Sequence, residues 1–190
     1  FETIGHEAKF RNAKMSYYAG EFKWAKTQAD VLKGSVEKLI ANDALELSLI
    51  ISDAIGVDTN AAPLNMFAAS ELLMRQGRYP EALAKMDSIN LVFSNHTLGD
   101  DIFYKKAEIF RKTGKYADAE SMYKNIIEYY PTGLYGDNAQ MQLAQLYEFD
   151  LKDLAKAREA YADMLTKYPG SVFTVEARKR YRQLRGDTVN

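Results

Sequence analysis

The sequence predicts an all-α protein built of stacked antiparallel helical hairpins, and three observations lead to this prediction. A motif of basic, polar, Gly, basic and Tyr residues occurs at 75–79 and again at 112–116, with its glycines 37 residues apart. Apolar residues around each copy recur at three- and four-residue spacing, which is the period of an amphipathic helix. The eleven glycines and four prolines are spread at intervals, as expected for turns between helices rather than for linkers.

The repeat continues along most of the chain. A shift of 37 residues aligns Ala82 with Ala119, and a shift of 38 aligns Ala119 with Ala157 and Pro131 with Pro169. The first helix of the last copy aligns at 37 instead, so one extra residue is expected in the turn at 149–152. A more diverged copy lies at the start of the chain, and fixed-period self-similarity of this kind indicates a repeat architecture.

We therefore predict one helical-repeat domain over 1–190. Its expected parts are a diverged hairpin (1–35), an extra helix (36–62), three repeats (63–96, 97–133 and 134–169) and a capping helix (170–190).

Glycine and proline mark the predicted helix boundaries. Gly20, Gly77 and Gly114 stand where a first helix must end, and a left-handed position after a helix favours glycine. Pro80 is expected in the first turn of a second helix, where its missing N–H costs nothing. Small residues recur where two helices must approach closely: Ala25, Ala82, Ala119 and Ala157.

The extra helix and the last helix depart from the repeat. Asn42 or Asp43 is expected to cap the extra helix and Gly56 to end it. Its apolar stripe is Leu47, Ile50, Ile51 and Ala54, widened by Leu45 and Leu49. We expect this helix to lie between the first hairpin and the next. The last helix is expected to turn Val175, Ala177, Tyr181 and Leu184 inward.

One repeat carries the residues of a known family signature: Phe103, Ala107, Phe110, Gly114, Tyr116, Ala119, Tyr123, Ile126 and Pro131. This pattern resembles the tetratricopeptide repeat, although the family's usual Leu-Gly pair is Lys106-Ala107 here. The resemblance covers about 130 residues in one register. It implies a right-handed superhelix of helical hairpins that binds proteins or peptides on the concave face lined by the first helices.

By this alignment, twelve inward positions form the predicted peptide groove. They are Phe10, Phe67, Tyr104 and Met141; Lys14, Glu71, Glu108 and Gln145; and Tyr17, Met74, Arg111 and Glu148. An apolar and aromatic stripe beside a mixed-charge stripe suits an extended or helical ligand. The alternative is that the four apolar residues are packed between neighbouring helices.

The last helix offers a second candidate surface, formed by Arg178, Lys179, Arg180, Arg182 and Arg185. It fits an acidic partner, or it is a solvated face that complements the negative end of its own helix.

The chain contains few residues of the types that usually carry catalysis. There is no cysteine, and His6 and His96 are the only histidines, so we predict no catalytic, metal-binding or cofactor-binding residues. His96 is expected to be a solvated loop residue. Asp100-Asp101 and Asp137-Asn138 are expected to cap helices rather than to act as paired carboxylates.

The predicted function is that of a non-catalytic scaffold for a protein or peptide ligand, with the oligomeric state left open. A net charge of −1 argues against nucleic acid, and no apolar run approaches the ~18 residues of a membrane-spanning helix. The alternative is a structural C-terminal part of a longer repeat protein, because the chain starts at Phe1 without Met. Its Tyr-Pro repeat ends resemble bacterial cell-envelope proteins of this family, which implies a periplasmic or envelope location, with the cytoplasm as the alternative.

Overall fold

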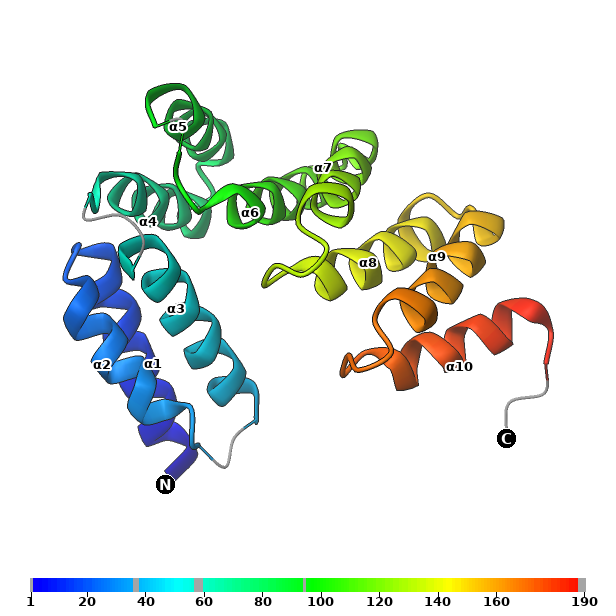
Figure 1. The fold of residues 1–190 in the computed structure, drawn as a ribbon, viewed down its shortest axis with the longest axis horizontal. Helices are drawn as coiled ribbons and strands as arrows, with labels where there is room; N and C mark the ends of the chain where they lie inside the picture. Colours follow the sequence, from blue (N-terminus) through cyan, green and yellow to red (C-terminus); the bar gives the residue numbers. More distant parts are fainter. Residues whose placement is uncertain (1, 36–37, 57–59, 94, 188–190) are drawn as a thin grey trace. The chain divides into compact units, whose positions relative to one another are not determined.

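The computed structural model describes residues 2–35, 38–56, 60–93 and 95–187 and is helical in all its regular parts. The chain forms two compact units, Phe1–Gly99 and Asp100–Asn190. Each is a set of antiparallel helical hairpins (Figure 1), which confirms the predicted fold class.

The first unit contains five helices in its described residues. Their bounds are α1 (Glu2–Tyr18), α2 (Phe22–Leu32), α3 (Lys38–Gly56), α4 (Ala62–Arg75) and α5 (Tyr79–Val92). Helices α1 and α2 form one hairpin, and α4 and α5 form the other. Helix α3 packs along α2 and also contacts α1 and α4, while α4 touches α1 directly. Helix α3 therefore lies beside the first hairpin and separates it from α4 only in part.

The second unit begins with α6 and contains three successive first helices of the repeat. Its elements are α6 (Gly99–Lys112), α7 (Tyr116–Tyr129), α8 (Gly136–Gln145), the π-helical segment η1 (Leu146–Asp150), α9 (Leu154–Lys167) and α10 (Thr174–Arg185). An apolar cluster in this unit extends from Phe103 to Leu184. Ile102 and Ile109 of α6 are buried as well. Ala119 and Ala157 lie in the cluster fully buried, and Ala25 and Ala82 are equally buried in the first unit, as the repeat predicted.

The predicted helix ends are confirmed at the three glycines. Gly114 has φ +75°, its N–H donates to Arg111, and the next N–H, of Lys115, donates to Phe110. This pair of bonds is the Schellman closure, which requires a left-handed residue. The same closure occurs at Gly20 and Gly77, and Pro80 stands in the first turn of α5.

The extra residue predicted near 149–152 appears as the π-helical segment. The N–H of Leu151 donates to the carbonyl of Leu146, five residues back, and Asp153 donates to Tyr147, six residues back. This second bond corresponds to the bond from Lys115 to Phe110, with one more residue enclosed. A single inserted residue inside a helix produces this kind of bulge.

Several local predictions were wrong. Helix α3 begins at Lys38, so Asn42 and Asp43 lie inside it and do not cap it, although Gly56 is its last residue. Leu45 is 43% exposed, because it lies about 200° around the helix from buried Leu47.

The acidic pairs and the last helix also differ from expectation. Asp100, Asp101 and Asp137 lie within the first turns of α6 and α8 rather than before them, where a carboxylate still complements the helix dipole. On α10, Ala177 is fully buried as predicted, but Val175 is 75% exposed.

Candidate functional site

The predicted groove residues of the first unit lie on α1 and α4. Tyr17 and Phe67 are fully buried, while Phe10 and Met74 are half-buried. Residues buried as fully as Tyr17 and Phe67 pack between helices and offer no surface to a ligand. Of the polar residues, the side chain of Lys14 is 21% exposed and that of Glu71 only 8%.

Lys14 and Glu71 form the charged centre of this first part. Lys14 Nζ lies 3.7 Å from Glu71 Oε1 and sits over the rings of Tyr17 and Tyr18, 5.3 and 5.8 Å from their centroids. The guanidinium of Arg75 also lies over the Tyr18 ring, 6.0 Å from its centroid. The Lys14–Glu71 pair therefore links α1 to α4. Cation–π contacts with the rings of Tyr17 and Tyr18 also hold the Lys14 ammonium in place.

The predicted groove residues of the second unit lie on α6, α8 and η1. Met141 is buried, Tyr104 and Gln145 are half-buried, and the side chain of Glu108 is 44% exposed. Tyr104 stacks on Tyr135 with ring centroids 4.2 Å apart and an interplanar angle of 11°. The aromatic position is thus fixed by a neighbouring ring and keeps part of its surface accessible.

Arg111 is held by two neighbours that sequence reasoning missed. Its Nε donates to Asp150 Oδ2 at 2.7 Å and one terminal nitrogen donates to Gln142 Oε1 at 2.7 Å. Charge-assisted bonds of this length fix a guanidinium firmly. Burial raises the pKa of the nearby Tyr123 hydroxyl to about 12, although Arg111 lowers it, so this phenol stays neutral at physiological pH.

Glu148 occupies the equivalent position one repeat later and has similar partners. It accepts a hydrogen bond from the Tyr161 hydroxyl at 2.7 Å and pairs with Arg180 at 3.4 Å. Burial and the bond to Glu148 raise the pKa of Tyr161 well above its usual value. Arg180 also pairs with Glu176 and lies over the Phe149 ring, 5.1 Å from its centroid.

These contacts share one register. Arg111 reaches Gln142, 31 residues on, and Glu148 reaches Arg180, 32 residues on. Both join the end of one first helix to the middle of the next, so a search for complementary polar pairs at this spacing would have found them.

The other basic residues of α10 lie outside this network. Arg178, Lys179 and Arg182 are exposed, and Arg185 pairs with Asp187. Of the five predicted basic residues, only Arg180 is turned toward the neighbouring first helix.

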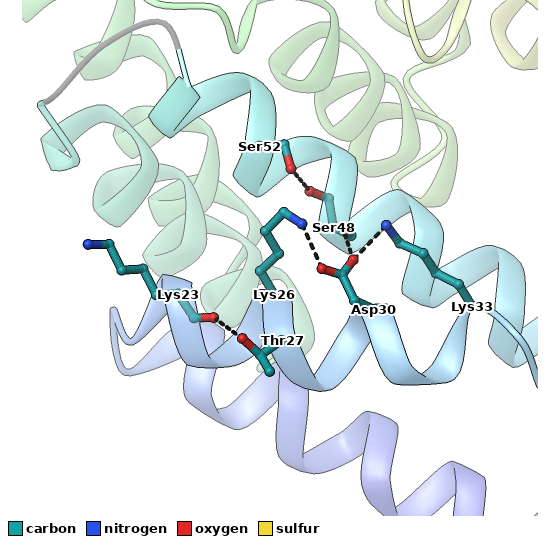
Figure 2. Close-up of polar contacts among 7 residues, drawn as sticks. All are labelled: Lys23, Lys26, Thr27, Asp30, Lys33, Ser48 and Ser52. Atoms are coloured by element: carbon teal, nitrogen blue, oxygen red, sulfur yellow. Dashed lines mark hydrogen bonds and ion pairs between the residues drawn. The ribbon is translucent and has the colours of Figure 1, made fainter.

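A separate polar cluster joins α2 to α3 (Figure 2). Asp30 accepts bonds from Ser48 of α3 and from Lys26 and Lys33 of its own helix, each at 2.6 Å. Burial alone would raise the pKa of Asp30, but these three donors together hold it far below its usual range. The cluster links α2 to α3, because the Asp30 carboxylate of α2 accepts the bond from Ser48 of α3.

The histidines have structural partners. His96 Nδ1 accepts from the Leu98 N–H and Nε2 lies 2.8 Å from Asn90 Oδ1, and burial lowers its pKa. It is therefore a neutral turn residue and not the solvated one we expected. Among the residues that the structure describes, no group of three His, Asp or Glu side chains is arranged to hold a metal ion, and no helix is long and apolar enough to cross a membrane.

Hairpins in one register, with polar side chains along their first helices, define a helical-repeat protein. Comparison with known proteins agrees: residues 104–172 match the family model of the tetratricopeptide repeat. A crystal structure of a thermophilic tetratricopeptide-repeat protein from Thermus thermophilus is similar, with a TM-score of 0.51, 18% identity, and 95% of this chain and 98% of that chain covered. No curated protein matches the sequence significantly.

Proposed function

We propose that this protein is a non-catalytic scaffold that binds a protein or peptide along the first helices of residues 100–190. One observation carries the proposal: Tyr104, Glu108 and Arg111 of one repeat keep accessible surface, as does Gln145, the equivalent of Glu108 in the next repeat. Arg111 is also fixed by Asp150 and Gln142. Side chains that are preorganised in this way lose little entropy when a ligand binds.

The ligand chemistry follows from these positions. A half-buried aromatic ring, an exposed carboxylate, a guanidinium and an amide alternate along the surface, so an extended segment with mixed polar and apolar side chains fits best. Tetratricopeptide repeats generally act as protein-interaction scaffolds, which supports the same reading. The buried residues Tyr17, Phe67 and Met141 of the predicted groove act through packing in this proposal.

Site-specific photo-crosslinking tests the proposal directly. A photoreactive residue is placed at Glu108 on α6 or, as the control, at the exposed Glu128 on α7, and the protein is irradiated in lysate of its source cell. We expect a discrete crosslinked protein from position 108 and none from position 128. The double variant Glu108→Arg/Gln145→Glu should lose the same partner without a change in melting temperature. Crosslinks from position 128 alone would place the binding surface elsewhere.

A second candidate function is that of a structural part of a longer repeat protein. The specific observation is a group of exposed apolar residues on the first hairpin: Ile4, Met15, Trp24 and Val31. The Trp24→Ser/Val31→Ser variant tests it: unchanged solubility and dye binding would mean that this group needs no covering partner.

We also propose the cell envelope as the setting, supported by the Tyr-Pro ends at Tyr130-Pro131 and Tyr168-Pro169. Fractionation of the source cell with an antibody to this chain tests it, and recovery in the cytoplasmic fraction alone would contradict it.

A further inference from the structure

Helix α10 stands in the same register as α8. The two helices begin 38 residues apart, at Gly136 and Thr174, and the same shift aligns the fully buried Ala139 with the fully buried Ala177. The faces of the two helices can therefore be compared position by position.

The relevant face of α8 is covered by the second helix of its own repeat, α9. Gln140 is 2% exposed and its Nε2 donates to the carbonyl of Ala160 on α9 at 2.8 Å. Ala144 on the same face is buried, and so is Tyr147 on the adjoining segment η1. Lys156 of α9 lies over the Tyr147 ring, while the Tyr147 hydroxyl donates to Glu120 of α7. In α8 this surface is thus a helix-docking surface.

The equivalent residues of α10 are Arg178, Arg182 and Arg185, and the structure leaves them exposed. They follow one another at four and three residues, so with Lys179 they form a basic face about 120° wide. Within the described part of the chain, only Arg185 of these four forms an ion pair, with Asp187. The face that contacts a helix on α8 therefore carries a row of exposed basic side chains on α10.

We propose that this basic face binds an acidic helical segment of another protein, which lies against α10 as α9 lies against α8. The repeat register indicates a helical partner, because the equivalent face of α8 contacts the helix α9. The charges of Arg178, Lys179 and Arg182, which form no ion pair in the described residues, indicate that this partner is acidic. A helix with Glu or Asp at i, i+3 and i+4 would pair with all three.

Other anionic partners fit less well. Interfacial binding to a membrane needs a wide apolar face beside the basic one, but α10 turns Ala177, Tyr181 and Leu184 into the core and exposes Val175 alone of its large apolar residues. The whole chain has a net charge of −1, so no wider positive field attracts nucleic acid to a face only about 18 Å long. This face lies on α10, whereas the residues that carry the proposed function lie on α6 and α8.

Fluorescence anisotropy with a defined probe tests the inference on the full chain. The probe is a labelled helical peptide of Glu and Ala with Glu spaced at three and four residues. The control peptide has the same composition interrupted by two prolines, which prevent a continuous helix. We expect the helical peptide to bind, more weakly as salt rises, and the proline peptide to bind about tenfold less.

Two variants with the same change in net charge distinguish binding to this face from an effect of the protein's overall charge. Arg178→Glu/Arg182→Glu should abolish binding, while Lys115→Glu/Arg158→Glu, which changes exposed residues on other elements, should preserve it. The milder Arg178→Gln/Arg182→Gln must show the same loss, and circular dichroism must show that all variants melt normally. Equal loss in both charge-reversal variants, equal binding of both peptides, no binding, or tighter binding of duplex DNA or phosphatidylglycerol vesicles would overturn the proposal.

Discussion

Lys152 shows how a single residue departs from the repeat. It has φ +57° and follows the π-helical segment, 38 residues after Gly114, so it takes the left-handed turn position that glycine takes in the three other turns. A side chain in this conformation costs roughly 1–2 kcal/mol through the clash of its Cβ with the backbone. Lys152 is exposed, and no contact in the described residues offsets this strain.

We expect Lys152→Gly to stabilise the protein. Relief of the strain exceeds the extra chain entropy of glycine in the unfolded state, which leaves a gain of about 0.5–1 kcal/mol. For a chain of this size the melting temperature should rise by about 1–4 °C. The control is Lys115→Gly in the equivalent turn, where φ is −86°, so glycine should lower the melting temperature. A rise in both variants would refute the explanation by strain.

Asp30 gives a pH dependence with a definite sign. Because its folded pKa lies below the unfolded value, its stabilising contribution is complete at neutral pH and is lost as the pH falls below about 4. The difference in melting temperature between the original protein and Asp30→Asn should be largest at pH 7 and should shrink below pH 4. Asp163→Asn, which removes only an exposed pair with Lys167 on one helix, should differ little at any pH. A constant difference for Asp30→Asn would rule out this electrostatic origin.

At the scale of elements, sequence periodicity identified the hairpins and their turns well. The glycines that end helices, Pro80 and the buried alanines follow local rules of backbone geometry and close packing. Their roles can therefore be predicted from the sequence without knowing which helix packs opposite. The start of α3 was missed because Asn42 and Asp43 are also acceptable inside a helix once its apolar face is buried. Tertiary packing outweighed their preference for a cap.

The site was harder to predict than the fold. The repeat register located Arg111 and Glu148 in the predicted groove, but it did not predict their partners. Their bonds to Gln142, Asp150 and Arg180 depend on rotamers of long side chains on neighbouring helices, which one helix pattern does not specify. Burial of Tyr17 and Phe67 depends in the same way on which helix lies opposite.

Ala119→Leu tests the close approach of two helices. Ala119 is fully buried in the first turn of α7, where three added carbons have no space, so we expect a loss of about 1–3 kcal/mol in the free energy of unfolding, measured by denaturant melts. Ala117→Leu, two residues earlier and exposed, should change stability by no more than about 0.5 kcal/mol. If the two variants behave alike, the assigned inward face of α7 is wrong.

At the scale of the whole molecule, stability comes from apolar packing rather than from charge. Most ion pairs in the described residues join positions three or four apart on one helix, such as Lys167–Asp163 and Lys124–Glu120, and exposed pairs of this kind contribute little. Cross-helix pairs occur inside each unit, such as Lys14–Glu71 in the first and Arg111–Asp150 in the second, and each unit buries apolar residues of its own. Each unit should therefore carry its own stability.

The second unit offers the sharpest test of this inference. Its core cluster is formed entirely by residues between Phe103 and Leu184, and the segment that matches the tetratricopeptide model lies within it. In repeat proteins, stability is approximately a sum of contributions from single repeats and from contacts between neighbours. Residues 100–190 expressed alone should therefore give a helical far-ultraviolet circular dichroism spectrum and one cooperative thermal transition. Ala119→Leu should destabilise this fragment by the same amount as it destabilises the full chain. A broad, non-cooperative melt, or a fragment insensitive to the substitution, would mean that the core of this unit does not form without residues 1–99.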